Sequence, residues 1–297
     1  MGGGEGPGKN SVMPTNRELA VPYALSGLLA ALLGVSSVVG LFFGGRGLYD
    51  AYPASLAGLV GQDAVTLVVG VPLLIVSVWL TRRGSIGALL VWAGALFYFA
   101  YSYYFYVTGG FNALFLVYVA IVSTSLYGLL SLLFAVDAET IRARFGPGAP
   151  TGPIGGFFVG ISLLFFLLWG GMVVSSAVAG ARPDQVLRSV VAIDCTVLLP
   201  LLLFGGLRLW RGKAWGYVLG GLLLTKVAAT GFTLAFTTAL GALWAGRLGG
   251  FNAFLFVVFA LMATGALLLI VPYMRSIGKS GGPAPTETRR RTEGRDG

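Results

Sequence analysis

The chain has 297 residues, of which 56% are apolar and only 10% are charged. A water-soluble domain carries roughly 25% charged residues, so this composition excludes an ordinary soluble domain and favours an integral membrane protein. The chain has one cysteine, Cys195, and no histidine. A disulfide within the chain is therefore excluded. Histidine-based zinc sites, haem ligation by histidine and histidine acid–base catalysis are excluded as well.

The apolar residues fall in eight blocks, each close to the roughly 20 residues that cross a hydrocarbon core of about 30 Å as a helix. The sequence therefore predicts an all-α, polytopic integral membrane protein with eight transmembrane helices. The first block is longer than the apolar region of a cleavable signal peptide, so we expect it to be a span. The expected spans cover residues 20–43, 59–80, 86–107, 112–134, 154–178, 189–209, 214–240 and 252–273.

The distribution of basic residues predicts the orientation of these spans. With the N-terminus inside, 15 of the 20 Lys and Arg residues lie in inner segments, which is the excess that cytoplasmic segments normally carry. We therefore expect a cell-membrane protein with both termini in the cytoplasm. This rule also accounts for the net charge of +9, so no nucleic-acid partner is predicted. The basic residues outside the inner segments are Arg46, Arg182, Arg188 and Arg247 in outer loops and Lys226 within a span.

A short motif occurs twice in the chain. GGFNALF occupies residues 109–115 and GGFNAFLF occupies residues 249–256, each at the start of a predicted span. Glycine adopts positive φ at little cost, so we expect the Gly pairs to form tight outer turns. Asn112 and Asn252 stand where helix N-caps belong. This structural interpretation explains the motif without a ligand.

The repetition extends beyond the motif. Pro72 and Arg83 are separated by the same interval as Pro200 and Arg211, near the inner ends of the second and sixth spans. We therefore predict two four-helix repeats, which are parallel because an even number of spans returns the chain to the same side. The expected organisation is a disordered cytoplasmic N-terminus (1–19), a first repeat (20–134), a cytoplasmic linker (135–153), a second repeat (154–273) and a disordered basic cytoplasmic tail (274–297).

Two runs of sequence carry a resemblance to known proteins. FNALFLVYVAIVSTSLY at residues 111–127 and WGYVLGGLLLTK at residues 215–226 resemble an uncharacterised family of multi-span bacterial membrane proteins. The resemblance covers most of the chain from about residue 63 onward. It implies a fold with many membrane spans. The family has no named function, so the resemblance implies no activity, cofactor or site residue.

Three ionisable residues, Asp63, Asp194 and Lys226, lie within the predicted spans. A charge at membrane depth costs on the order of a few kcal/mol, so such residues are usually paired, hydrated or functional. At a rise of 1.5 Å per residue, Asp194 and Lys226 fall at similar depths in adjacent spans. We expect them to form a buried ion pair, which would be either a structural bridge or part of a functional site.

Further polar side chains surround these charges. Thr230 and Thr233 follow Lys226 on one helix face, unless their hydroxyls only bond their own backbone carbonyls. Tyr98 and Tyr101 in the third span lie deep enough to line a cavity. We therefore predict an outward-facing polar pocket between the two halves. The candidate substrate-binding residues are Asp63, Tyr98, Tyr101, Asp194, Lys226, Thr230 and Thr233.

The best functional prediction is a small-solute or ion-coupled permease, with the lipid bilayer as partner and a small molecule or ion as substrate. The alternative is a non-catalytic membrane subunit, scaffold or sensor whose intramembrane charges are structural. The chain has no phosphate loop, nucleophile elbow, zinc motif or paired catalytic carboxylates. No enzymatic activity, cofactor or metal is therefore predicted, and the sequence predicts no particular oligomeric state.

Overall fold

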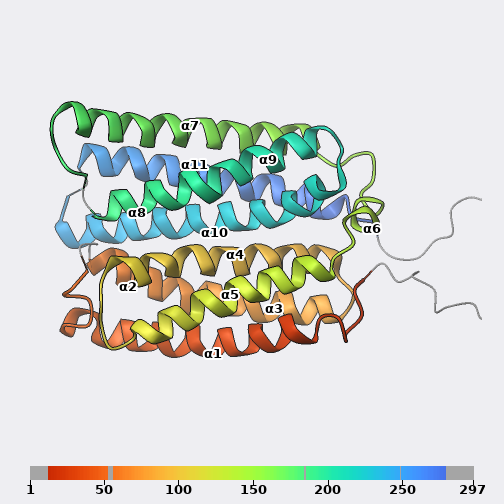
Figure 1. Ribbon diagram of the computed structural model, residues 1–297, viewed down its shortest axis with the longest axis horizontal. Coiled ribbons are helices and arrows are strands. Elements are labelled where there is room, and N and C mark those ends of the chain that lie inside the picture. Colours follow the sequence, from red (N-terminus) through yellow and green to blue (C-terminus); the bar gives the residue numbers. More distant parts are fainter. Residues whose placement is uncertain (1–12, 53–55, 184, 248, 279–297) are drawn as a thin grey trace, which may run out of the picture.

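The computed structural model describes residues 13–52, 56–183, 185–247 and 249–278. In these residues the fold is all-α, and its long helices run back and forth along one axis (Figure 1). Eight helical spans are long and apolar enough to cross a membrane. The prediction of eight spans is confirmed, and the chain is a multi-pass membrane protein. Most of the two segments expected to be disordered, residues 1–12 and 279–297, lies outside the described residues.

The spans follow one another with short connections. In the first half they are α1 (Ala20–Phe43), α2 (Leu56–Val65) continued by α3 (Val71–Arg82), α4 (Ile86–Gly109) and α5 (Phe115–Ala135). In the second half they are α7 (Thr151–Val178), α8 (Gln185–Ile193) continued by α9 (Leu199–Trp210), α10 (Ala214–Ala245) and α11 (Gly250–Arg275). The short helix α6 (Ala138–Arg142) lies between the halves. We call the end where α1 begins and α11 ends the terminal end, and the opposite one the distal end.

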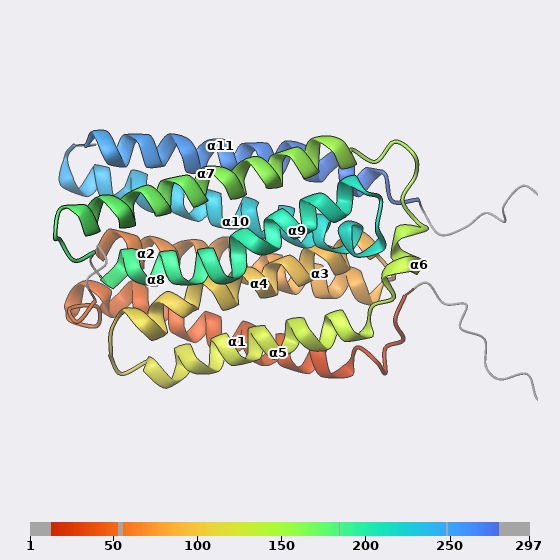
Figure 2. The same ribbon diagram turned by 45° about the horizontal axis from the view of Figure 1, so that its top comes forward.

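Two helices form the centre of the bundle. In their most apolar stretches, 83% of the residues of α4 and 72% of those of α10 are buried, whereas the other six spans bury 22% to 39%. Figures 1 and 2 show the helices of the two halves on opposite sides, with α4 and α10 along the boundary. A Cβ atom at Gly94 of α4 would lie 2.5 Å from both the Leu222 carbonyl oxygen and Thr225 Cβ of α10. Glycine at this position therefore allows the two central helices to approach closely.

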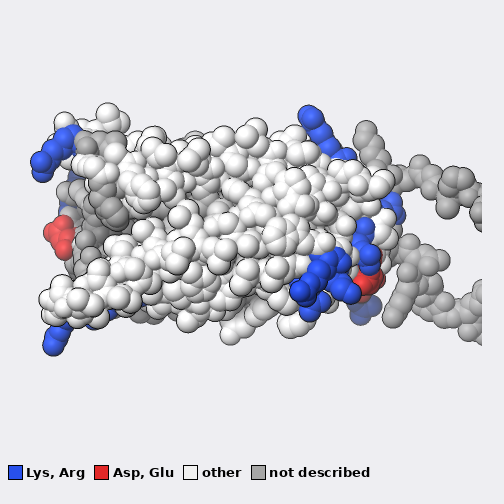
Figure 3. All heavy atoms as spheres, turned by 90° about the horizontal axis from the view of Figure 1, so that it is seen from above, with Lys and Arg blue, Asp and Glu red and all other residues white. Residues whose placement is uncertain are grey.

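The outer surface of the bundle is apolar along most of its length. On two outer helices, α5 and α7, four apolar side chains are each more than three-quarters exposed: Leu116, Phe134, Leu167 and Val178. Figure 3 shows Lys, Arg, Asp and Glu side chains at the two ends of the visible face and an uncharged surface between them. Such a surface suits a hydrocarbon environment, where a charge on the lipid side would be costly.

Two spans contain a π-helical turn just before a proline. The turn η2 (Thr66–Gly70) joins α2 to α3, and η3 (Asp194–Leu198) joins α8 to α9. Pro72 and Pro200 are each the second residue of the α-helix that follows. A proline ring clashes with the carbonyl four residues earlier, and here that carbonyl belongs to the π turn. The wider turn gives the ring room while the helix continues in the same direction.

The two halves also share a register. The turns η2 and η3 begin 128 residues apart, and so do α4 and α10. The same interval separates Gly84 and Gly212, which follow the two spans with φ of 87° and 61°. In this register Asp194 corresponds to Thr66. The two aspartates near these turns are therefore not equivalent, because Asp63 lies one helical turn earlier.

The two GGFNA segments do not form the turns that the motif predicts. Positive φ occurs at glycines elsewhere in the described residues, and Gly110 is extended. A Cβ atom on Gly110 would lie 3.1 Å from the Tyr52 ring, so close packing rather than turn geometry favours glycine there. Asn112 accepts a hydrogen bond from a backbone N–H two residues later, but α5 begins after that residue. Asn252 lies inside α11, which begins at Gly250, so the predicted N-caps are wrong.

The segment expected to be a linker, residues 135–153, contains regular structure. It contains α6, and α7 begins before its expected end. The Gly146 N–H donates to the Ser276 carbonyl, and the Gly278 N–H donates to the Arg144 carbonyl, both at 2.9 Å. These hydrogen bonds hold the linker against the end of α11. The first residues of the expected tail are therefore ordered as well.

Candidate functional site

A cavity of about 290 Å³ lies between the two halves. Its walls come from α2 and α4 of the first half and from the helices of the second half, α7 to α11. Its deepest residues include Leu202, and it extends to Tyr52 and Thr108 at the distal end. Burial raises the pKa of the Tyr52 hydroxyl, so this group stays neutral at the cavity mouth. The lining is mainly apolar with a few convergent polar groups, which is typical of a small-ligand site.

Six of the seven candidate residues line this cavity. They come from α4, η3 and α10, elements that belong to both halves of the chain. The seventh, Asp63, is not among the lining residues. The six are Tyr98, Tyr101, Asp194, Lys226, Thr230 and Thr233.

Asp194 lies at the deeper end of the cavity and is 4% exposed. Its Oδ1 atom accepts a hydrogen bond of 2.7 Å from the Tyr101 hydroxyl. Its Oδ2 atom accepts one of 2.8 Å from the Trp169 indole N–H. Two neutral donors from different helices therefore hold the carboxylate in a fixed position.

Lys226 does not form the direct ion pair with Asp194 that its depth predicts. Within the described ranges, the one ion pair joins Arg142 to Glu139, with 3.4 Å between nitrogen and oxygen. The Lys226 ammonium instead lies 3.7 Å from the centroid of the Tyr101 ring. The prediction is wrong because Tyr101 packs under the ammonium and occupies one carboxylate oxygen with its hydroxyl. A cation over an aromatic face is stabilised by about 2 kcal/mol when both groups are desolvated.

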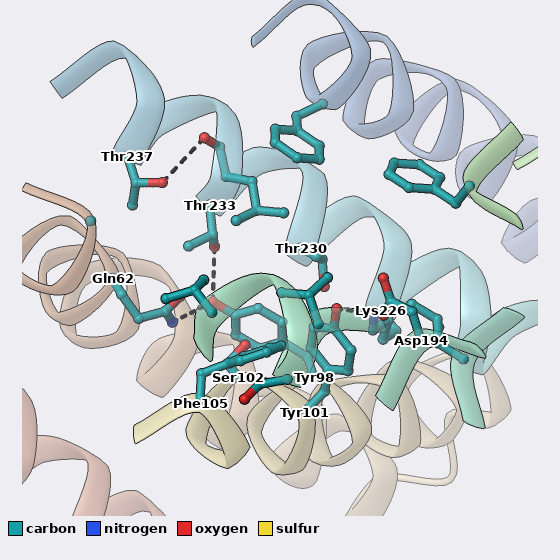
Figure 4. Close-up of a pocket in the computed structure, with 18 of the residues that line it drawn as sticks. Gln62, Tyr98, Tyr101, Ser102, Phe105, Asp194, Lys226, Thr230, Thr233 and Thr237 are labelled. Carbon is teal, nitrogen blue, oxygen red and sulfur yellow. Dashed lines mark hydrogen bonds between the residues drawn. The ribbon is translucent and has the colours of Figure 1, made fainter. Parts of the chain in front are cut away.

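The ammonium of Lys226 therefore keeps its hydrogen-bonding capacity unused. The side chain is 1% exposed, and its nitrogen has no hydrogen-bond or ion-pair partner among the residues that the structure describes. Figure 4 shows it beside Asp194 and Tyr101, at the opposite end of the drawn pocket from Gln62. An ammonium has three N–H donors, and burying them without acceptors is costly.

The other end of the polar lining is uncharged. Gln62 donates through Nε2 to the Tyr98 hydroxyl at 2.9 Å and to Thr66 Oγ1 at 3.1 Å. The Tyr98 and Thr233 hydroxyls lie 2.8 Å apart, and Thr233 also donates to the Ala229 carbonyl at 2.9 Å. These hydrogen bonds connect α2, α4 and α10 across the boundary between the halves (Figure 4). In the common register Tyr98 corresponds to Lys226, so one half has a phenol where the other has an ammonium.

The three threonines of α10 that line the cavity differ in their hydrogen bonds. Thr233 and Thr237 bond backbone carbonyls of their own helix, as expected for threonines in helices. Thr230 is 6% exposed, and its hydroxyl has no hydrogen-bond partner in the described part of the chain. It lies one helical turn from Lys226, so two unsatisfied polar groups neighbour each other in the cavity wall.

Asp63 belongs to a separate cluster near the distal end. Its Oδ2 accepts a hydrogen bond of 2.5 Å from the Tyr49 hydroxyl, and its Oδ1 accepts one of 3.2 Å from the Tyr106 hydroxyl. The side chain is fully buried, and a Cβ atom on Gly40 of α1 would collide with it. Tyr49 and Tyr106 also pack against Tyr52, with edge-to-face and tilted rings. Both carboxylate oxygens thus have phenol partners, and this aspartate faces α1 rather than the cavity.

No family model matches the chain, and no curated protein or solved structure matches it either. The resemblance seen in residues 111–127 and 215–226 therefore stays a prediction. The geometry of the cavity is left as the basis for a functional assignment.

Two residues that matter in the cavity were missed by the sequence analysis. Gln62 has a polar amide within a predicted apolar span and directly precedes Asp63, so the sequence alone could have indicated it as a candidate. Trp169 donates to Asp194 over 25 residues of sequence, and nothing in the pattern distinguishes it from the chain's other tryptophans. Within the described ranges, no group of three or more Asp, Glu, Cys or His side chains lies together to hold a metal ion.

Proposed function

We propose that the protein is a small-solute permease whose substrate binds in the cavity between the two halves. The observation that carries the proposal is the buried Lys226 ammonium, which faces the cavity and has no hydrogen-bond or ion-pair partner in the part of the chain that the structure describes. Burying a charge costs several kcal/mol unless acceptors surround it. A lysine with a purely structural role would have such acceptors within the protein. A solute that enters the cavity supplies them instead.

We further propose that the two halves are parallel four-helix repeats. The shared interval of 128 residues supports this, as do the two π turns that precede equivalent prolines. Transporters built from such repeats bind their substrates at the repeat interface near the middle of the membrane. Lys226 lies about four residues from the midpoint of α10, or roughly 6 Å along the helix axis. The candidate site is therefore close to the depth that the proposal requires.

The proposed orientation places the terminal end in the cytoplasm and the distal end outside the cell membrane. The excess of Lys and Arg in the segments at the terminal end supports this orientation. Single cysteines at Arg211 and Arg247, introduced after replacement of the native Cys195, would test it. A membrane-impermeant thiol reagent applied to intact cells is expected to label Arg247→Cys and to leave Arg211→Cys unlabelled. The reverse pattern would refute the orientation.

Transport itself is tested by uptake into proteoliposomes. The panel contains 3-phenylpropionate, 3-phenylpropanamide and 3-phenylpropylamine, which share one body and differ in the charge of the head group. Wild-type protein is expected to accelerate the entry of at least one of them above the rate in protein-free vesicles. Lys226→Met should lose this acceleration, whereas Lys213→Met, an exposed lysine at the start of the same helix, should keep it. Equal rates for wild type and protein-free vesicles would refute the permease.

One observation favours a sensor or subunit as the second candidate. The lining residues reach the distal end, but the cavity stops well before the terminal end, with Leu202 several residues from the end of α9. A protein that only detects a solute from one side of the membrane needs a cavity that opens to that side alone. Binding of a probe without uptake would favour this alternative.

A further inference from the structure

The unused hydrogen-bonding groups of the cavity lie together on one helix face. Lys226 contributes an ammonium and Thr230 a hydroxyl, one turn apart on α10, and both are at least nine-tenths buried. Figure 4 shows both side chains within the same pocket. An ammonium only donates hydrogen bonds, and a hydroxyl can donate one. The wall therefore offers donors at this point and requires acceptors from whatever occupies the space.

The charged acceptor of the cavity, Asp194, already has donors within the protein. Both oxygens of Asp194 receive hydrogen bonds, from Tyr101 and Trp169. A cationic ligand would share these oxygens with the two donors and would also approach the positive charge of Lys226. An anionic ligand instead meets a cation and a hydroxyl that have no hydrogen-bond partner in the described residues, and it leaves the two hydrogen bonds of Asp194 in place. Charge-assisted hydrogen bonds of this kind are roughly twice as strong as neutral ones.

The rest of the cavity sets the size and the character of the ligand. A volume of about 290 Å³ lies at the lower end of the roughly 300–1,000 Å³ of small-molecule pockets, so the cavity admits a small ligand. Around the donors the walls are apolar, with Ile161, Phe165, Phe259 and Met262 on the side of α7 and α11. Such walls suit an aliphatic or aromatic body and provide no partners for the hydroxyls of a sugar.

We infer that the cavity binds a small organic carboxylate with an apolar body, whose carboxylate lies between Lys226 and Thr230. This inference rests on the proposed function, since it names the substrate class of the same site. The carboxylate oxygens accept hydrogen bonds from the Lys226 ammonium and the Thr230 hydroxyl. The apolar body extends along α10 toward the rings of Phe165 and Phe259, which stack with a centroid separation of 6.5 Å.

The test is direct binding to the purified full-length protein in detergent, measured by isothermal titration calorimetry. The probes are 3-phenylpropionate, its neutral amide and 3-phenylpropylamine, which share a phenyl ring on a short chain and are small enough for a pocket at the lower end of the usual size range. Wild-type protein is expected to bind the acid at least tenfold more tightly than the amide or the amine. Lys226→Met should abolish this preference, and Lys213→Met should retain it.

Thr230→Val provides a second test that does not depend on the stability of Lys226 variants. Valine has the shape of threonine without the hydroxyl, so binding of the acid should weaken by roughly tenfold, as for one lost hydrogen bond to a charged group. Unchanged affinity in both Thr230→Val and Lys226→Met would overturn the inference. Tighter binding of the amine or the amide, or no binding of any probe, would overturn it as well.

The binding and uptake experiments together distinguish a failure of the carboxylate inference from a failure of the permease proposal. If the acid binds through Lys226 but does not enter proteoliposomes, the ligand class stands and the permease is refuted in favour of a sensor. If the amine or the amide is taken up instead of the acid, the permease stands and the carboxylate inference is refuted.

Discussion

Replacing Lys226 by methionine tests whether this residue is a structural charge or an unused binding group. Methionine has an unbranched chain of similar length, so it fills most of the same space without the ammonium. The variant loses the contact with the Tyr101 ring, worth about 2 kcal/mol at a desolvated site. It also avoids the burial of an ammonium that has no hydrogen-bond partner in the described residues, a cost of several kcal/mol. Asp194 keeps both of its neutral donors.

These opposing changes leave a small difference in the free energy of unfolding, within about 1 kcal/mol of wild type. A broken buried ion pair would instead cost about 3–5 kcal/mol. At roughly 2–4 °C per kcal/mol for a chain of this size, we expect a shift in Tm of no more than about 4 °C. The assay is thermal unfolding of purified protein in detergent, with Lys213→Met as the control.

A loss of roughly 10 °C in Lys226→Met would refute this reasoning, particularly if Asp194→Asn restored the stability of the double variant. Such recovery is the mark of two groups that stabilise each other. Lys226 would then be one half of a structural pair, and the permease proposal would lose the observation that carries it.

Two further substitutions test the packing around the cavity, each by the same thermal assay. Trp169→Phe removes the indole donor from Asp194 and should cost about 1–3 kcal/mol; Trp215→Phe, at an exposed indole, should change stability by less than about 0.5 kcal/mol. Gly94→Ala places a methyl group 2.5 Å from atoms of α10 and should cost about 1–3 kcal/mol or more. Gly160→Ala, where the added Cβ would meet no other helix of the described residues within 4 Å, should be neutral or slightly stabilising. Equal effects of the two glycine substitutions would contradict the close approach of α4 and α10.

The eight spans were predictable because length and hydropathy alone specify a membrane helix. Six of the residues that line the cavity were predictable too, since polar residues within apolar spans are few and helical spacing shows which ones share a face. Thr230 and Thr233, for example, follow Lys226 on one side of α10. The sequence could therefore indicate a set of candidates without any knowledge of the tertiary contacts.

The pairing of those candidates was not predictable. Depth along the membrane placed Asp194 beside Lys226, but it gives no rotation of one helix about its axis relative to another. Tyr101 consequently fills the position that a direct ion pair would need. Asp63 was assigned to the cavity for the same reason, although its partner Tyr49 lies in a loop outside every expected span.

The π turn at η3 (Asp194–Leu198) has a mechanical consequence for the cavity. A π turn amounts to one additional residue within an α-helix. The same helix can accommodate this additional residue at different positions along its length. When the π turn moves along the helix, each residue that it moves past rotates by about 100° about the helix axis, since an α-helix has 3.6 residues per turn. If the π turn moved toward the start of α9, the Asp194 side chain would rotate away from the face of the helix that contacts Tyr101 and Trp169. A shift of the π turn within one helix would thus change whether the Asp194 carboxylate faces a bound solute, without movement of the other helices.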